Sequence, residues 1–206
     1  MGTTTLAAFL AVDLLLVFTP GADWAYAISA GLRGRSVVPA VTGLIAGHLA
    51  YALVAVAGLA VLVASSPAAL TALTVAGAGY LLWLGWGVLR EPAVPTADEE
   101  NAGVSRSQMV LKGFGISGLN PKALLLYFSL FPQFIDPATG WPVAAQTGLL
   151  STVHLVVCAV VYLGVGLLAR TVLSTRPAAA RAVTRVSGAI MILIGVFLLV
   201  ERLTGV

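Results

Sequence analysis

Two charged residues lie inside long apolar stretches of the chain, and each follows a proline closely. Asp23 comes after Thr19-Pro20-Gly21, and Lys122 comes directly after Asn120-Pro121. A carboxylate can bind an ammonium group and a lysine can bind a carboxylate, so the two side chains together suit a small zwitterion. We therefore predict a substrate-binding site for such a molecule. Its expected residues are Thr19, Gly21, Asp23, Asn120 and Lys122.

Each of these charges also has a structural explanation. Asp23 could cap the helix that starts after Pro20, although a carboxylate at membrane depth costs about 3 kcal/mol and Ser or Thr would cap more cheaply. Lys122 lies too deep for an easy reach to the membrane surface, so it needs an acidic partner, a set of carbonyls or a substrate carboxylate. A static ion pair between the two charges would look the same in the sequence.

Three further titratable residues form a candidate proton relay. Asp13 lies two turns before Pro20, and His48 and His154 each occupy an otherwise apolar stretch. Histidine titrates near neutral pH and can shuttle protons, although a lone histidine on an apolar helix often only packs. Asp13 could instead lie near the outer face of the membrane, where water makes a charge cheap.

Two other kinds of function remain open for the histidines. His48 and His154 could bind a haem, which would make the chain a membrane redox protein, or they could serve a divalent-metal exporter. Few carboxylates and a single thiol, Cys158, make a poor metal cage. We therefore predict neither a metal site nor a cofactor.

The composition is that of an integral membrane protein. Hydrophobic residues make up 59% of the chain, charged residues only 9%, and the mean hydropathy is +1.01. Soluble domains carry about 25% charged residues. The net charge of +3 does not indicate nucleic-acid binding, because the cations lie between apolar segments rather than along a basic stripe.

The apolar segments predict an all-α membrane protein with six transmembrane helices, because a span needs about 20 residues. Two halves, 1–89 and 109–206, flank a polar cytoplasmic linker over 90–108. Pro20 and Pro121 break the first helix of each half, and irregular backbone at membrane depth survives only where it lines a cavity. The expected spans cover residues 6–28, 39–63, 69–89, 109–131, 143–169 and 183–200.

The distribution of lysine and arginine predicts that both termini face outward, because cation-rich short loops stay in the cytoplasm. Three spans per half then make the halves inverted repeats, an arrangement that many secondary transporters share. Gly43 and Gly47 form a GxxxG pair, which we assign to internal packing in preference to a homodimer face. The cations between the predicted spans, or in the first turn of a span, are Arg33, Arg35, Arg90, Arg106, Lys112, Arg170, Arg176, Arg181 and Arg185.

Three blocks of sequence resemble the lysine exporter (LysE) family, nearest its homoserine/threonine-type efflux proteins, over nearly the whole chain. The first is Pro20-Gly21-Ala22-Asp23 with Gly31-Leu32-Arg33-Gly34-Arg35, in which Ala22 replaces the family's second proline. The second is Gly79-Tyr80-Leu81-Leu82-Trp83-Leu84-Gly85, and the third joins Asn120-Pro121-Lys122 to Phe131-Pro132-Gln133-Phe134.

This resemblance implies a carrier in the bacterial inner membrane that exports small amino acids or their derivatives and is not an enzyme. The glutamine-asparagine pair of the lysine and arginine exporters is absent, which argues against basic substrates. The chain contains no nucleotide-binding loop, so an ion gradient must supply the energy, and we expect the ion to be a proton.

Overall fold

The computed structural model describes residues 1–32, 36–65 and 105–169, together with scattered helical positions of one to three residues between 71 and 90 and between 182 and 200. The third and sixth predicted spans, most of the linker and the Arg33 and Arg35 loop therefore lie outside the continuously described segments. Within the described residues, all regular structure is helical. The helices are α1 (Thr3–Val17), α2 (Ala22–Leu32), α3 (Val38–Ser65), α5 (Arg106–Gly118), α6 (Pro121–Leu125), η2 (Leu126–Leu130), η3 (Phe131–Phe134), η4 (Pro137–Thr139) and α7 (Val143–Leu168).

Two of these helices are long and apolar enough to cross a membrane, namely α3 over Val38–Gly58 and the whole of α7. The pair α1 and α2 passes the same test together, with a bend of 62° between them. The break falls where Pro20 predicts it. The predicted fourth span begins at Arg106, three residues early, and continues beyond its own break as α6, a π-helical turn and a 3-10 turn.

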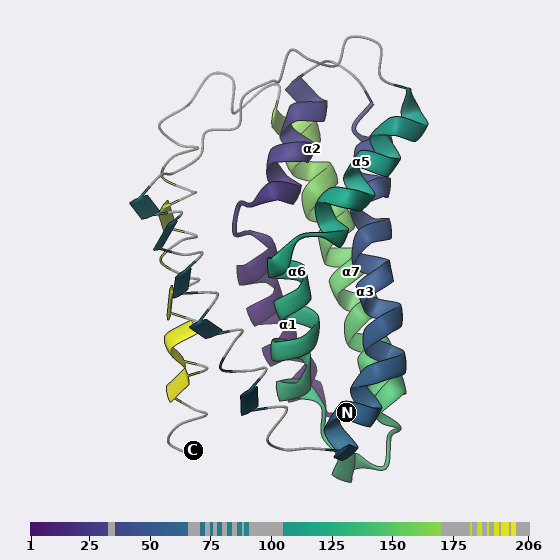
Figure 1. The fold of residues 1–206 in the computed structure, drawn as a ribbon, viewed down its shortest axis with the longest axis vertical. Helices are drawn as coiled ribbons and strands as arrows, with labels where there is room; N and C mark the ends of the chain where they lie inside the picture. The colour runs from purple at the N-terminus through teal and green to yellow at the C-terminus, as the bar shows by residue number, and fades with distance from the viewer. Residues whose placement is uncertain are drawn as a thin grey trace.

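The two broken helices run in opposite directions (Figure 1). The chain passes upward through α1 and α2, and downward through α5 and α6, whereas α3 descends and α7 ascends alongside them. An inverted repeat requires these opposed directions. Because the third helix of each half lies outside the continuous segments, the full six-helix repeat stays a prediction.

Close packing of α3 against α5 depends on the GxxxG pair. A Cβ atom on Gly43 would overlap the backbone carbonyl of Val110, and one on Gly47 would lie 2.6 Å from the Cβ atom of Ser117. From the other side, a Cβ atom on Gly113 would lie 2.7 Å from the carbonyl of Ala40. This glycine face is therefore occupied by α5 in the same chain, as internal packing requires.

Replacing Gly47 by alanine should destabilise the protein by about 1–3 kcal/mol, because its new methyl group would meet backbone atoms that cannot move aside cheaply. The thermal midpoint of detergent-purified protein should fall. Gly58→Ala on the same helix is the matched control, since a Cβ atom there meets no described atom within 4 Å. Equal midpoints for Gly47→Ala and the wild type would contradict this packing.

Candidate functional site

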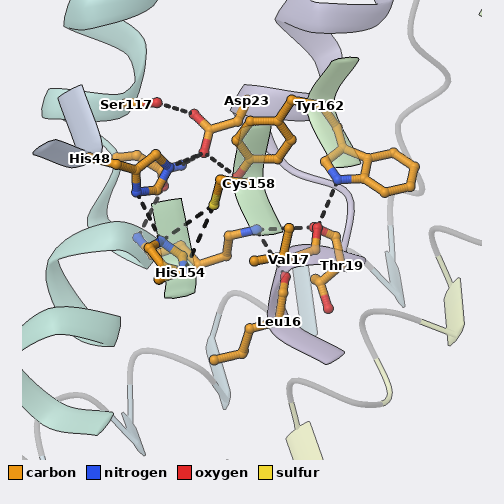
Figure 2. Close-up of polar contacts among 12 residues, drawn as sticks. Leu16, Val17, Thr19, Asp23, His48, Ser117, His154, Cys158 and Tyr162 are labelled. Carbon is orange, nitrogen blue, oxygen red and sulfur yellow. Dashed lines mark hydrogen bonds and ion pairs between the residues drawn. The ribbon is translucent and has the colours of Figure 1, made fainter. Parts of the chain in front are cut away.

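Asp23 lies fully buried in the first turn of α2 and accepts hydrogen bonds from other helices (Figure 2). The Ser117 hydroxyl donates to Oδ1 over 2.8 Å, and Asn120 Nδ2 and the Tyr162 hydroxyl each donate to Oδ2 over 3.1 Å. His48 Nε2 lies 3.3 Å from Oδ2. Among the described residues, every partner of this carboxylate is a side chain, so Asp23 does not act here as a cap for backbone amides.

Lys122 is also buried, and its ammonium group lies at the broken end of α1. Nζ donates to the carbonyls of Thr19 over 3.0 Å and Leu16 over 3.3 Å. The sequence left three partners open for this lysine, namely an acid, a set of carbonyls or a substrate carboxylate. The structure shows the carbonyls. No direct ion pair joins it to Asp23 within the described part of the chain, although the two charges are near enough to interact electrostatically.

The backbone carbonyls freed by the first break are satisfied by side chains. Thr19 Oγ1 donates to the carbonyl of Leu15, and Trp24 Nε1 donates to the carbonyl of Val17, each over 2.8 Å. Lys122 Nζ donates to the carbonyls of Leu16 and Thr19. Because hydrocarbon offers no water, these bonds allow a non-helical segment to persist inside an apolar protein.

The second break faces the first and is stabilised in a similar way. The Asn120 side chain caps α6 by accepting from the backbone amide of Lys122 over 3.0 Å, while its Nδ2 bonds Asp23. The Tyr51 hydroxyl donates to the carbonyl of Gly118 over 2.8 Å. Gly21 lies opposite the lysine, since a Cβ atom on it would stand 3.7 Å from Lys122 Nζ. The predicted substrate residues thus converge from both breaks.

Asp13 and the two histidines extend this cluster into a continuous chain of contacts. Asp13 Oδ1 lies 2.6 Å from His154 Nδ1, and His154 Nε2 lies 3.2 Å from His48 Nδ1. His48 Nε2 then reaches Asp23 Oδ2. Asp13 is fully buried. Its position relative to the outer face of the membrane stays a prediction.

Comparison with known proteins identifies the family. A model described as LysE type translocator matches residues 14–202. The chain belongs to the LysE family. It is a membrane protein of a translocator family, with helices apolar enough to span a bilayer. No solved structure matches it.

Several bacterial relatives share parts of the LysE-family chain or nearly all of it. A homoserine/homoserine lactone efflux protein of Salmonella typhimurium is 29% identical over 201 residues, which is 95% of this chain and 96% of the relative. A leucine efflux protein of an Enterobacter species is 34% identical over 125 residues, 59% of each chain. An uncharacterized membrane protein of Vibrio cholerae is 34% identical over 138 residues, 66% of this chain and 67% of its own.

Two of the family blocks fall on the breaks of this LysE-family chain. Pro20 to Asp23 connects α1 to α2, and Ala22, which stands in place of a second proline, is the first residue of α2. The third block begins α6 with Pro121 and supplies η3 over Phe131–Phe134. The second block, over residues 79–85, lies mostly outside the described residues.

Two alternatives for the histidines can be compared with this geometry. An iron ligated by both would hold their nitrogens on opposite sides of a porphyrin, whereas His48 Nδ1 and His154 Nε2 are in direct hydrogen-bond contact. Ligand atoms of His48, His154 and Cys158 do gather within 4.8 Å. All four ring nitrogens also contact a carboxylate or the other ring. The absence of a metal site stays a prediction.

Sequence reasoning missed Ser117 and Tyr162, which donate to Asp23, and it considered Cys158 only as a metal ligand. Cys158 Sγ in fact lies 3.4 Å from His154 Nε2. The missed signal was the spacing of polar residues along α7, which repeats at helical intervals and places them on one buried face. The members of this stripe are Thr147, Ser151, His154, Cys158 and Tyr162.

Proposed function

We propose that this chain is a secondary transporter that exports small neutral amino acids or their close derivatives. The observation that carries the proposal is the convergence of two buried opposite charges, Asp23 and Lys122, on two facing helix breaks. Relatives named for leucine efflux and for homoserine/homoserine lactone efflux support the substrate class. In transporters, broken helices at the meeting of two halves form such sites.

In this proposal, Asp23 binds the ammonium group of the substrate and Lys122 binds its carboxylate. Asp23 Oδ1 accepts from only Ser117 among the described residues and so retains acceptor capacity for an ammonium group. Lys122 holds its ammonium group on two backbone carbonyls, which it can exchange for a carboxylate, a stronger partner. Thr19, Gly21 and Asn120 supply the surrounding polar backbone and side chains.

Energy for export comes from the proton gradient in our proposal, since the chain carries no nucleotide-binding loop. The protein resides in the inner membrane of a bacterium with both termini outside, as the cation distribution favours. A homodimer, if it forms, uses a face other than Gly43 and Gly47, because α5 covers that pair.

An efflux screen tests this function. Cells that overproduce the protein are loaded with single radiolabelled amino acids, including leucine, homoserine, threonine and lysine. We expect faster loss of at least one neutral or hydroxylated amino acid than from cells with an empty vector, no effect on lysine, and collapse of the difference with an uncoupler. If no amino acid leaves faster from the overproducing cells, the proposed function is wrong.

A further inference from the structure

The unbroken line of contacts from Asp13 through His154 and His48 to Asp23 suggests a specific role that rests on the proposed transport function. We propose that these four residues carry the coupling proton to the substrate site and there make proton binding compete with binding of the substrate ammonium group. The line crosses between elements, since Asp13 lies on α1, His154 on α7, His48 on α3 and Asp23 on α2. Three contacts of 2.6, 3.2 and 3.3 Å connect them.

A count of hydrogens indicates that these four residues hold one proton more than two ionised carboxylates and two neutral histidines would carry. Each of the three contacts needs one hydrogen to be a hydrogen bond. An ionised carboxylate brings none and a neutral imidazole brings one, so two carboxylates and two neutral histidines supply only two. One contact would then set two lone pairs against each other. If all three contacts are hydrogen bonds, the group holds a third hydrogen, which belongs to the whole group rather than to one residue.

The charges of the buried groups also favour one additional proton. Asp13 and Asp23 contribute two negative charges, while Lys122 contributes one positive charge. The additional proton makes the cluster electrically neutral. Without it, the cluster would keep one uncompensated negative charge in an apolar surrounding, which is the costly state that an arriving cation relieves.

Transfer along the line needs no change of partners. In one arrangement the Asp13 carboxyl donates to His154 Nδ1, His154 Nε2–H donates to His48 Nδ1, and His48 Nε2–H donates to the Asp23 carboxylate. Moving each hydrogen across its own bond breaks one O–H and two N–H bonds and forms two N–H bonds and one O–H. The proton charge then resides on Asp23, which is neutralised and loses its attraction for a substrate ammonium group.

The Asp13 end carries the unpaired groups expected of an entry point. Asp13 Oδ2, the Tyr127 hydroxyl and the Ser151 hydroxyl are buried and have no hydrogen-bond partner within the described part of the chain. Tyr127 packs edge-on to His154 with 5.5 Å between ring centres, and Ser151 lies one turn before His154 on α7. Buried polar atoms usually have partners, so each of these groups is a candidate to bind a buried water, and we assign delivery of the proton to a water or hydronium ion at Asp13 Oδ2. With the N-terminus outside, Asp13 lies nearer the outer face than Asp23.

The other titratable groups around the line come from three elements. They are Lys122 on α6, Tyr127 on η2, and Cys158 and Tyr162 on α7. Cys158 shares His154 Nε2 with His48, and Tyr162 shares Asp23 Oδ2 with His48. Cys158 and Tyr162 lie beside the line and contact His154 and Asp23 respectively.

Liposomes containing the purified protein separate proton coupling from substrate binding. Two rates are measured with radiolabelled leucine or homoserine, whichever the efflux screen identifies: exchange at equal substrate and equal pH, and uptake driven by a pH gradient. We expect Asp13→Asn and His154→Gln to lose gradient-driven uptake by at least about a hundredfold, as loss of a positioned proton carrier implies, while exchange continues. Thr152→Val, on the exposed face of α7, should keep both rates.

The outcomes distinguish failure of the proton pathway from failure of the proposed transport function. If the wild type exchanges no substrate, the proposed transport function is itself wrong. The proposed proton pathway from Asp13 to Asp23 is wrong if gradient-driven uptake survives in both variants. It is also wrong if uptake by the wild type follows a sodium gradient and does not depend on pH. Stoichiometric zinc in the purified wild type that disappears in His154→Gln would overturn it too, because the histidines would then be metal ligands.

Discussion

Changing Asp23 to asparagine is expected to abolish both efflux and substrate exchange. Asparagine keeps the size of the side chain and one oxygen acceptor, but it cannot offset the ammonium charge of a zwitterion. Losing one partner of a buried, hydrogen-bonded charge pair costs about 2–5 kcal/mol, so transport should fall at least about thirtyfold. Efflux of the screened amino acid from cells, normalised to the amount of protein in the membrane, measures the loss.

The matched control for this change is Asp136→Asn, which alters an exposed carboxylate in the loop before α7. It should transport like the wild type. Exchange by Asp23→Asn at the normal rate would show that the substrate does not need this charge. Unlike the Asp13 and His154 variants, Asp23→Asn is expected to lose substrate exchange as well as uptake driven by a pH gradient. The reason is that Asp23 belongs both to the substrate site and to the proposed proton pathway.

Changing Lys122 to methionine should stop transport to a similar extent. Methionine retains the apolar stem but removes the group that binds the substrate carboxylate. It also takes the Lys122 donor from the carbonyl of Thr19 and one of two donors from the carbonyl of Leu16, which keeps the Thr19 amide. An orphaned buried carbonyl costs about 1–3 kcal/mol, so loss of the donor to Thr19 should also lower the thermal midpoint of the purified protein. Efflux and melting are therefore measured on the same preparations.

Lys112→Met provides the comparison for this second change, since Lys112 is an exposed cation on α5. It should leave both efflux and melting unchanged. A Lys122→Met protein that melts earlier yet transports normally would show that the lysine only stabilises the break. The predicted result is loss of transport at temperatures well below the midpoint of the variant.

The prolines and apolar runs predicted much of the described fold. Proline lacks an amide hydrogen and clashes with the preceding turn, so Pro20 and Pro121 located both breaks. Continuous apolar segments of sufficient length gave α3 and α7 to within a few residues at each end. The residues flanking the breaks then indicated which charges would lie near the centre of the molecule.

The contacts of those charges could not be predicted, because span length does not fix the rotation of a helix about its axis. Lys122 could have paired with an acid, but helix packing brings its ammonium group to the carbonyls of Leu16 in α1 and of Thr19 in the break. The polar stripe of α7 shows which face is buried without showing that His154 would meet Asp13 on one side and His48 on the other. Side-chain partners across helices depend on packing that no single segment encodes.

The most direct test of a zwitterion site between the breaks is efflux by the double variant Asp23→Asn/Lys122→Met. If each charge binds one end of the substrate, removing both leaves the site without either contact. We expect efflux no higher than that of the single variants, with the protein still folded in the membrane. If the two charges only balance one another within the fold, removing both eliminates the orphaned charge. Recovery of efflux to nearly the wild-type rate would therefore contradict substrate binding by Asp23 and Lys122.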